Sequence, residues 1–121
     1  MMLATAGLYA QTKNDLPNVT IKDLAGKDVN IATLSNDGKP FFITFWATWC
    51  GPCRMLSPVL EDLAEERPDI KVGKVNIDEQ SELANQFHIM SIPTLLVFKN
   101  GKKTGESVGV IPKSSIEVLL E

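Results

Sequence analysis

The sequence contains two cysteines, Cys50 and Cys53, separated only by Gly51 and Pro52. A disulfide that closes so short a ring stabilises a fold little, because its effect on the unfolded chain grows with loop length. Residues i and i+3 at the start of a helix nevertheless lie roughly 5–6 Å apart, which a disulfide can span. The spacing therefore predicts a pair whose role is redox chemistry rather than structural cross-linking.

A second interpretation of this pair is half of a metal site. Tetrahedral zinc needs four ligands, but the sequence has no further cysteine and a single histidine, His88. Copper could use Met55 or Met90, although methionines at such positions usually serve packing. We therefore expect no metal and no other cofactor.

The elements around the cysteines are a buried strand and an amphipathic helix. Phe41–Ala47 is a nearly continuous apolar run, which is typical of a strand buried on both faces. A helix that ends at Pro68 follows the cysteines. Its predicted apolar face comprises Met55, Leu56, Val59, Leu60, Leu63 and Ala64. The cysteines thus lie where a central strand gives way to a helix, the edge at which open α/β sheets place their sites.

The rest of the pattern predicts alternating strands and helices. The expected elements are a hairpin of Val19–Lys22 and Asp28–Ile31 turning at Gly26, a helical turn over Ala32–Asn36, strands Ile70–Ile77, Thr94–Lys99 and Lys103–Val108, and helices Ser81–Phe87 and Lys113–Leu120. Helices between strands indicate a parallel sheet, to which the Asn100-Gly101 turn adds an antiparallel edge pair. This order predicts an α/β fold, a three-layer α/β/α sandwich.

Length and charge restrict the class of protein and its partners. The chain has 121 residues, of which 44% are apolar, enough for one domain with a sizeable core. Twelve basic against fifteen acidic residues give a net charge of −3, which excludes nucleic acid and anionic lipid as main partners. We expect a monomer.

The first residues suggest a segment outside the domain. Met1–Ala10 is apolar, uncharged and ends in small residues, like the tail of a secretory signal. The absence of a basic residue before Lys13 argues against a signal and leaves a disordered terminus as the alternative. We expect a domain over residues 16–121, preceded by residues 1–15. A signal remnant would place the protein in the periplasm or elsewhere outside the cytoplasm, and a plain terminus would place it in the cytoplasm.

Four motifs resemble the thioredoxin family in order and spacing. They are Trp46–Arg54 (WATWCGPCR), Ser91–Thr94 (SIPT), Phe98–Lys102 (FKNGK) and Val108-Gly109. The resemblance covers about Phe41 to Glu121 and implies a thioredoxin fold with a central mixed sheet. The hairpin between Leu16 and Asp37 is instead similar to secreted redoxins of the TlpA/ResA type. A natural variant and an engineered hybrid both fit this combination.

The resemblance implies a thiol–disulfide oxidoreductase that reduces protein disulfides. Cys50 would be the nucleophile, with its thiol pKa lowered by the helix N-terminus, an effect for which thioredoxins are a standard example. Cys53, one turn deeper, would resolve the mixed disulfide. Gly51-Pro52 is typical of the reducing members, which draw electrons from a reductase or a membrane donor. The alternatives are a disulfide oxidase or isomerase of the same fold, and a non-catalytic binding subunit.

The resemblance also implies a docking groove for the substrate. The Ile92-Pro93 peptide is expected to be cis and to present the Ile92 backbone to an extended substrate. The groove would be formed by Trp49, Gly51, Pro52, Ile92, Pro93, Val108 and Gly109. Trp46 fits the groove and the core equally well.

One position departs from the family pattern. Thioredoxins usually carry a buried aspartate where this sequence has Thr44, and the lysine that accompanies it corresponds to Lys74. A threonine is no general base, so deprotonation of Cys53 would depend on water, Lys74 or the leaving thiolate. We expect the second step to be slower than in relatives with the aspartate.

Overall fold

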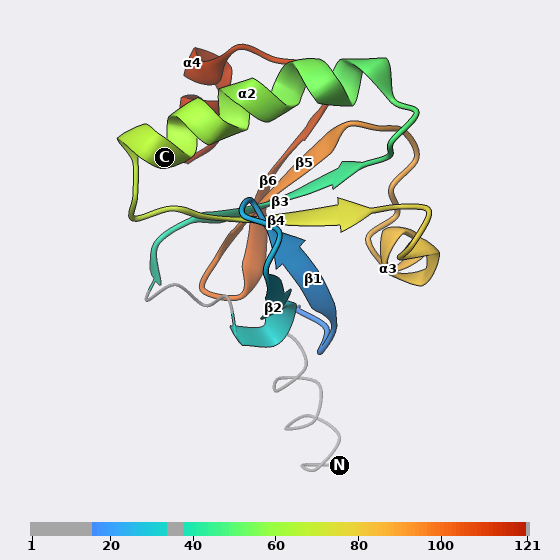
Figure 1. Ribbon diagram of the computed structural model, residues 1–121. Coiled ribbons are helices and arrows are strands. Elements are labelled where there is room, and N and C mark those ends of the chain that lie inside the picture. The colour runs from blue at the N-terminus through green and yellow to red at the C-terminus, as the bar shows by residue number, and fades with distance from the viewer. Residues whose placement is uncertain (1–15, 34–37, 121) are drawn as a thin grey trace, which may run out of the picture.

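The computed structural model describes residues 16–33 and 38–120, in which one mixed sheet carries helices on both faces (Figure 1). The strand order is β2-β1-β4-β3-β5-β6. The strands are β1 (Thr20–Asp23), β2 (Asp28–Asn30), β3 (Phe41–Trp46), β4 (Lys71–Asn76), β5 (Thr94–Lys99) and β6 (Lys102–Val108). The helices are η1 (Ile31–Thr33, a 3-10 turn), α2 (Gly51–Glu66), α3 (Ser81–Gln86) and α4 (Lys113–Leu119). The predicted elements and the hairpin are confirmed, whereas residues 1–15 and the end of the predicted helical turn lie outside the described residues.

The direction of β5 differs from the prediction. β3 and β4 are parallel, but β5 is antiparallel to β3, so the expectation of parallel strands at β5 is wrong. Thr94 pairs with Phe45, which means that β5 starts at the edge where β3 ends. The segment between β4 and β5, which contains α3, therefore begins and ends at this edge of the sheet instead of returning to the opposite one.

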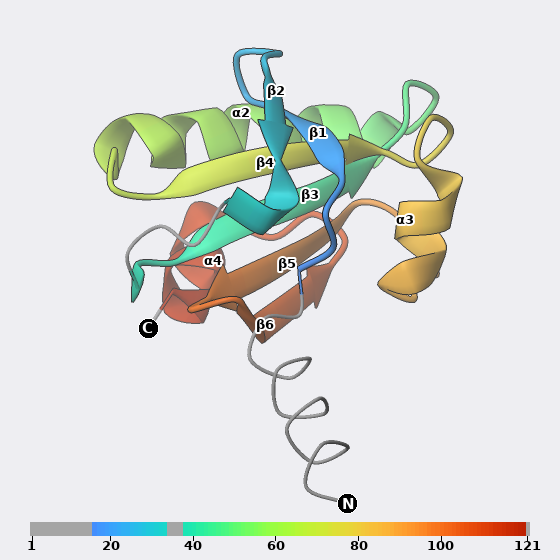
Figure 2. The ribbon, with the colours of Figure 1, turned by 90° about the horizontal axis from the view of Figure 1, so that it is seen from below.

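The sheet separates two apolar clusters, as expected of three layers. Figures 1 and 2 show α2 and α4 together on one face, and α3 away from them at the end of β4. The cluster under α2 and α4 includes Phe42, Leu56, Leu60, Leu63, Val97, Ile116 and Leu120. The other cluster includes Ile21, Ile31, Phe41, Ile43, Phe45, Leu83 and Phe98. Because alternate residues of β3 enter opposite clusters, the strand is buried on both faces and fixes the edge from which the cysteine loop begins.

The buried stripe of α2 is narrower than predicted. Its buried residues are Cys53, Leu56, Leu60 and Leu63. Met55 is 65% exposed, so its assignment to the apolar face is wrong. At 3.6 residues per turn, Met55 points about 120° away from the centre of this stripe.

Within the described residues, every helix is too short or too polar to cross a lipid bilayer.

Candidate active site

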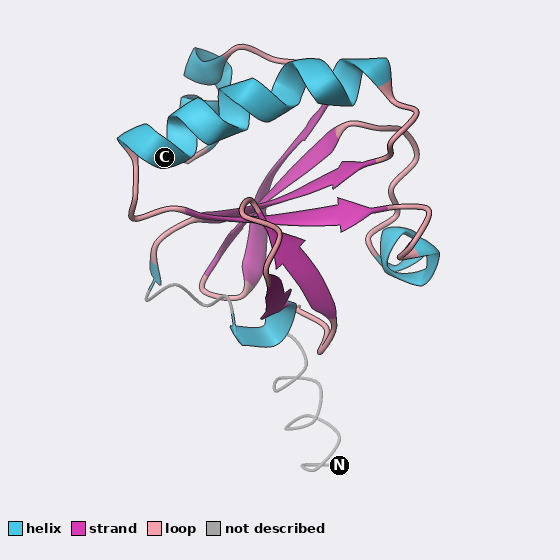
Figure 3. Cartoon of the chain, viewed as in Figure 1, coloured by secondary structure: helices cyan, strands magenta, loops and turns pink. Residues whose placement is uncertain are grey.

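Cys50 and Cys53 form a disulfide at the edge of the sheet where β3 ends. Their Cα atoms are 5.3 Å apart, within the range predicted from the sequence. A hydrogen bond from the Cys50 N–H to the Ala47 carbonyl, with 3.2 Å between N and O, closes the turn that follows β3. Figure 3 shows the loops that lead into α2 and β5 at this same edge. The topology therefore brings the cysteines and the Ile92-Pro93 segment together.

The two cysteines differ in their place on α2. Cys50 is the N-cap residue, and its Sγ accepts a hydrogen bond from the Cys53 backbone N–H at 3.1 Å. The N-terminus of a helix carries partial positive charge and free N–H groups, both of which favour a thiolate. Burial does not distinguish the two residues, since Cys50 is 4% and Cys53 5% exposed. Cys53 lies one turn further along α2 than Cys50, as the resemblance implied, and in the disulfide form the two residues are equally buried.

Trp49 lies exposed beside the disulfide and is held by a residue that the sequence did not single out. Its indole Nε1 donates a hydrogen bond to Asp78 Oδ2 at 2.9 Å. Asp78 follows β4, which is parallel to β3, so the two loops leave the sheet at the same edge. The only feature of the sequence that could have pointed to Asp78 is its place just after a core strand. Gly51 and Pro52 are also exposed, on the first turn of α2.

The Ile92-Pro93 peptide bond is cis, as the resemblance implied. Ile92 packs against the buried cluster of Ala47, Cys50 and Cys53, which places this segment beside the disulfide. The Gly109 N–H donates to the Pro93 carbonyl at 2.8 Å, and Gly109 has a φ of +94° that suits glycine. Val108, which is 55% exposed, precedes this contact. The structure therefore brings together Ile92, Pro93, Val108 and Gly109, which the sequence placed in one groove.

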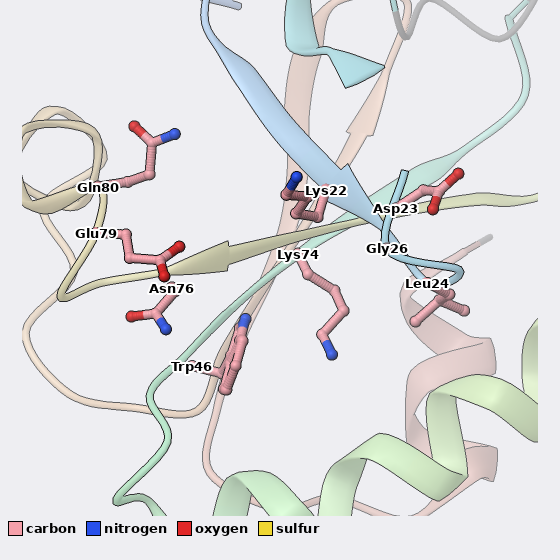
Figure 4. Close-up of a pocket in the computed structure, with 9 residues that line it drawn as sticks. All are labelled: Lys22, Asp23, Leu24, Gly26, Trp46, Lys74, Asn76, Glu79 and Gln80. Atoms are coloured by element: carbon pink, nitrogen blue, oxygen red, sulfur yellow. The ribbon is translucent and has the colours of Figure 1, made fainter. Parts of the chain in front are cut away.

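Thr44 and Lys74 are neighbours on β3 and β4, and Lys74 lies against Trp46. Thr44 is buried and pairs in register with Lys74. The Lys74 Nζ lies 4.7 Å from the ring centre of Trp46, a cation–π contact that holds the ammonium. Figure 4 shows the Trp46 and Lys74 side chains in a pocket of about 250 Å³ that Lys22 and Asp23 of the hairpin also line.

Trp46 and Lys74 also connect that pocket to the disulfide. Both line a second, smaller pocket of about 190 Å³ together with Cys53 and Arg54. Trp46 is half-buried and packs against the cluster of Ala47, Cys50 and Cys53, so it supports the region of the disulfide while part of its side chain stays exposed.

An apolar cleft of about 340 Å³ lies between Trp49, the residue before Cys50, and α3. It is lined by Trp49, Ile77, Ala84, Ile89, Met90, Ser91 and Ile92. Two of these, Trp49 and Ile92, were predicted to bind substrate. Met90, considered in the sequence only as a copper ligand, instead forms part of the wall. In the part of the chain that the structure describes, no three metal-binding side chains are grouped as a metal site requires.

Comparisons with known proteins agree with this geometry. A family model described as thioredoxin matches residues 10–121. The thioredoxin of Alicyclobacillus acidocaldarius is 47% identical over 94 residues, which cover 77% of this chain and 90% of that protein. Thioredoxin 1 of Nostoc sp. is 48% identical over 83 residues, covering 68% of this chain and 78% of that protein.

Solved structures show the same likeness. A thioredoxin variant from Halobacterium salinarum superposes with a TM-score of 0.67 at 38% identity, covering 73% of this chain and 77% of that one. The Fasciola hepatica thioredoxin gives a TM-score of 0.65 at 33% identity, over 69% and 81% of the two chains. With its two cysteines joined at the start of α2, the chain belongs to the thioredoxin family of disulfide oxidoreductases.

Proposed function

We propose that this protein reduces protein disulfides with Cys50 as the nucleophile and Cys53 as the resolving thiol. The observation that carries the assignment is the hydrogen bond from the Cys53 N–H to the Cys50 sulfur at the N-cap of α2. A helix N-terminus stabilises the charge of a thiolate there, and the thiolate is the form that attacks a disulfide.

Two exchanges transfer a pair of electrons to the substrate. The Cys50 thiolate attacks one sulfur of the substrate disulfide, forms a mixed disulfide and releases the other sulfur as a thiolate. Cys53 then loses its proton and attacks the Cys50 sulfur. The Cys50–Cys53 disulfide forms and the second substrate sulfur leaves. Because the two cysteines are three residues apart on one turn, little entropy is lost when the ring closes.

The substrate docks in the groove formed by Trp49, Gly51, Pro52, Ile92, Pro93, Val108 and Gly109. This part of the proposal is supported by the packing of Ile92 against the cluster that contains both cysteines, and by the hydrogen bond from Gly109 to Pro93, which follows Ile92. An extended substrate segment would lie along the Ile92 backbone and bring its disulfide sulfur to Cys50.

Lys74 assists the second step in place of the aspartate that Thr44 replaces. Lys74 and Cys53 line one pocket, so the ammonium is near enough to favour a developing Cys53 thiolate. Thr44 supplies no carboxylate to take up the proton, which supports a slower second step than in relatives that carry one.

The source of electrons, the location and the oligomeric state are further parts of the proposal. The protein acts as a monomer and receives its electrons from a reductase or a membrane donor. Its domain spans residues 16–121 and is preceded by residues 1–15.

The hairpin of β1 and β2 supports a likeness to secreted TlpA/ResA-type redoxins, and this likeness favours a location outside the cytoplasm. Fusion of residues 1–30 to a reporter enzyme that is active only after export tests the location, since an inactive fusion places the protein in the cytoplasm.

The test of the function is insulin reduction with dithiothreitol as the electron source. We expect the wild-type protein to accelerate it, Cys53→Ser to accumulate a mixed disulfide through Cys50, and Cys50→Ser to form none. A binding subunit would show neither catalysis nor dependence on Cys53. The reduction potential of the Cys50–Cys53 pair shows whether the protein reduces or oxidises its substrates, since a value near that of the secretory pathway would favour an oxidase or isomerase.

A further inference from the structure

Met90 is the most exposed large apolar side chain of the described residues, at 93%. The backbone on either side of it is held in place. The Ile89 N–H donates to the Ala84 carbonyl at 2.9 Å, and the Ser91 carbonyl accepts a hydrogen bond from Thr94 Oγ1 at 2.6 Å. The fold thus presents the Met90 thioether to solvent from a fixed segment, although burial of an apolar side chain would stabilise the protein.

The position of Met90 connects it to the redox centre. Met90 lines the 340 Å³ cleft together with Trp49, which precedes Cys50, and with Ile92, which packs against the buried cluster of Ala47, Cys50 and Cys53. The cleft therefore ends at residues that border the disulfide. A polypeptide whose disulfide reacts with Cys50 would place a neighbouring side chain in this cleft, against Met90.

We propose that Met90 binds substrate in this cleft and is a site of reversible oxidation that weakens substrate docking. The inference rests on the docking groove proposed above. The occupant is the segment of a substrate polypeptide next to its reacting cysteine, with an apolar side chain. A flexible thioether adapts its shape to different apolar side chains, which suits a protein that reduces more than one substrate.

The oxidant is a hydroperoxide. The Met90 sulfur attacks one peroxide oxygen, so that an S–O bond forms and the O–O bond breaks. The sulfur loses two electrons, and the peroxide is reduced to an alcohol or to water. In the disulfide form neither Cys50 nor Cys53 is a free thiol, so among the described residues Met55 and Met90 carry the sulfur atoms open to the oxidant.

The sulfoxide changes the cleft without changing the disulfide. Its polar S=O group must be desolvated when an apolar side chain docks against it, which weakens binding. Methionine sulfoxide reductases return the thioether, so the effect is reversible.

The experiment uses the full chain, oxidised at its disulfide and then treated with hydrogen peroxide. After removal of the peroxide and reduction of the disulfide with dithiothreitol, the protein is mixed with insulin or with a small aromatic disulfide that does not reach the cleft. We expect the second-order rate constant with insulin to fall about three- to tenfold, and that with the small disulfide to stay unchanged. Mass spectrometry of peptides verifies that Met90 has gained one oxygen.

The matched variants are Met90→Leu and Met55→Leu, each compared with its own untreated sample. Met90→Leu keeps an apolar side chain that peroxide does not oxidise, and we expect its rate constant to withstand the treatment. Met55 is also exposed but does not line the cleft, so Met55→Leu should lose activity as the wild type does. Equal losses in Met90→Leu and the wild type would overturn the proposal, as would full insulin activity of the Met90 sulfoxide. An untreated protein that fails to reduce insulin would instead refute the proposed function.

Discussion

The indole nitrogen of Trp49 and a carboxylate oxygen of Asp78 are joined by a 2.9 Å hydrogen bond across 29 residues of sequence. The bond connects the residue before the nucleophile to the loop after β4. Trp49 is 67% exposed, so packing alone does not fix its ring. The carboxylate therefore holds the indole at the rim of the cleft while leaving one face of the ring free for a substrate.

Removal of this acceptor should slow the reaction with protein substrates. We expect Asp78→Ala to lower the rate constant with insulin about two- to fivefold, because the indole loses its anchor and substrate binding must order it. Stopped-flow tryptophan fluorescence measures the rate. Asp78→Asn keeps an acceptor oxygen and should retain most of the activity. If Asp78→Ala reacts with insulin as fast as the wild type, the hydrogen bond does not position Trp49 for function.

Local features of the sequence were sufficient to predict most of the fold. Phe41–Ala47 lacks polar residues at alternate positions, so it could only be a strand covered on both faces. Asn100 and Gly101 adopt φ values of +57° and +79°, the conformation that an Asn-Gly turn favours. The spacing of Cys50 and Cys53 was sufficient to predict a redox pair. The cis peptide at Ile92-Pro93 was predicted only because the SIPT motif resembles the family.

The features that were missed depend on contacts between distant parts of the chain. The direction of β5 depends on where α3 ends relative to the sheet, which hydrophobic periodicity does not encode. Asp78 is one of fifteen acidic residues, and only the parallel pairing of β3 and β4 brings it to Trp49. Met90 looks like an ordinary apolar residue until the loop before Pro93 is seen to turn it outward.

Restoring a carboxylate at position 44 should accelerate the second exchange. Thr44 is buried, and burial raises the pKa of a carboxyl toward neutrality, where it can accept the proton of Cys53. We expect Thr44→Asp to resolve the mixed disulfide faster between pH 6 and 8, at a cost of about 1–3 kcal/mol in the free energy of unfolding. Rapid quenching with acid and separation of the mixed disulfide measure the step. Thr44→Val is the control, and an unchanged rate in Thr44→Asp would show that position 44 takes no part.

The aromatic cluster under α3 should determine stability without affecting redox chemistry. Phe98 stacks on Phe41 with ring centres 5.3 Å apart and meets Phe87 edge-on at 5.7 Å. We expect Phe98→Ala to lower the free energy of unfolding by about 3–5 kcal/mol, because it leaves a cavity in a closely packed cluster. Urea unfolding of the disulfide form gives the value. The reduction potential should stay unchanged, and a large shift would mean that this cluster positions the cysteines.

Loss of the Lys74 charge should slow the second exchange, with the strongest effect at low pH. The ammonium lies against Trp46 in the pocket that contains Cys53, where it favours the thiolate that attacks the mixed disulfide. A thiolate that loses this support forms only at higher pH, so the pH profile of resolution should move upward in Lys74→Met. Lys71→Met, at an exposed position of the same strand, should leave the profile in place. A profile of Lys74→Met that matches the wild type would assign the deprotonation to water or to the leaving thiolate.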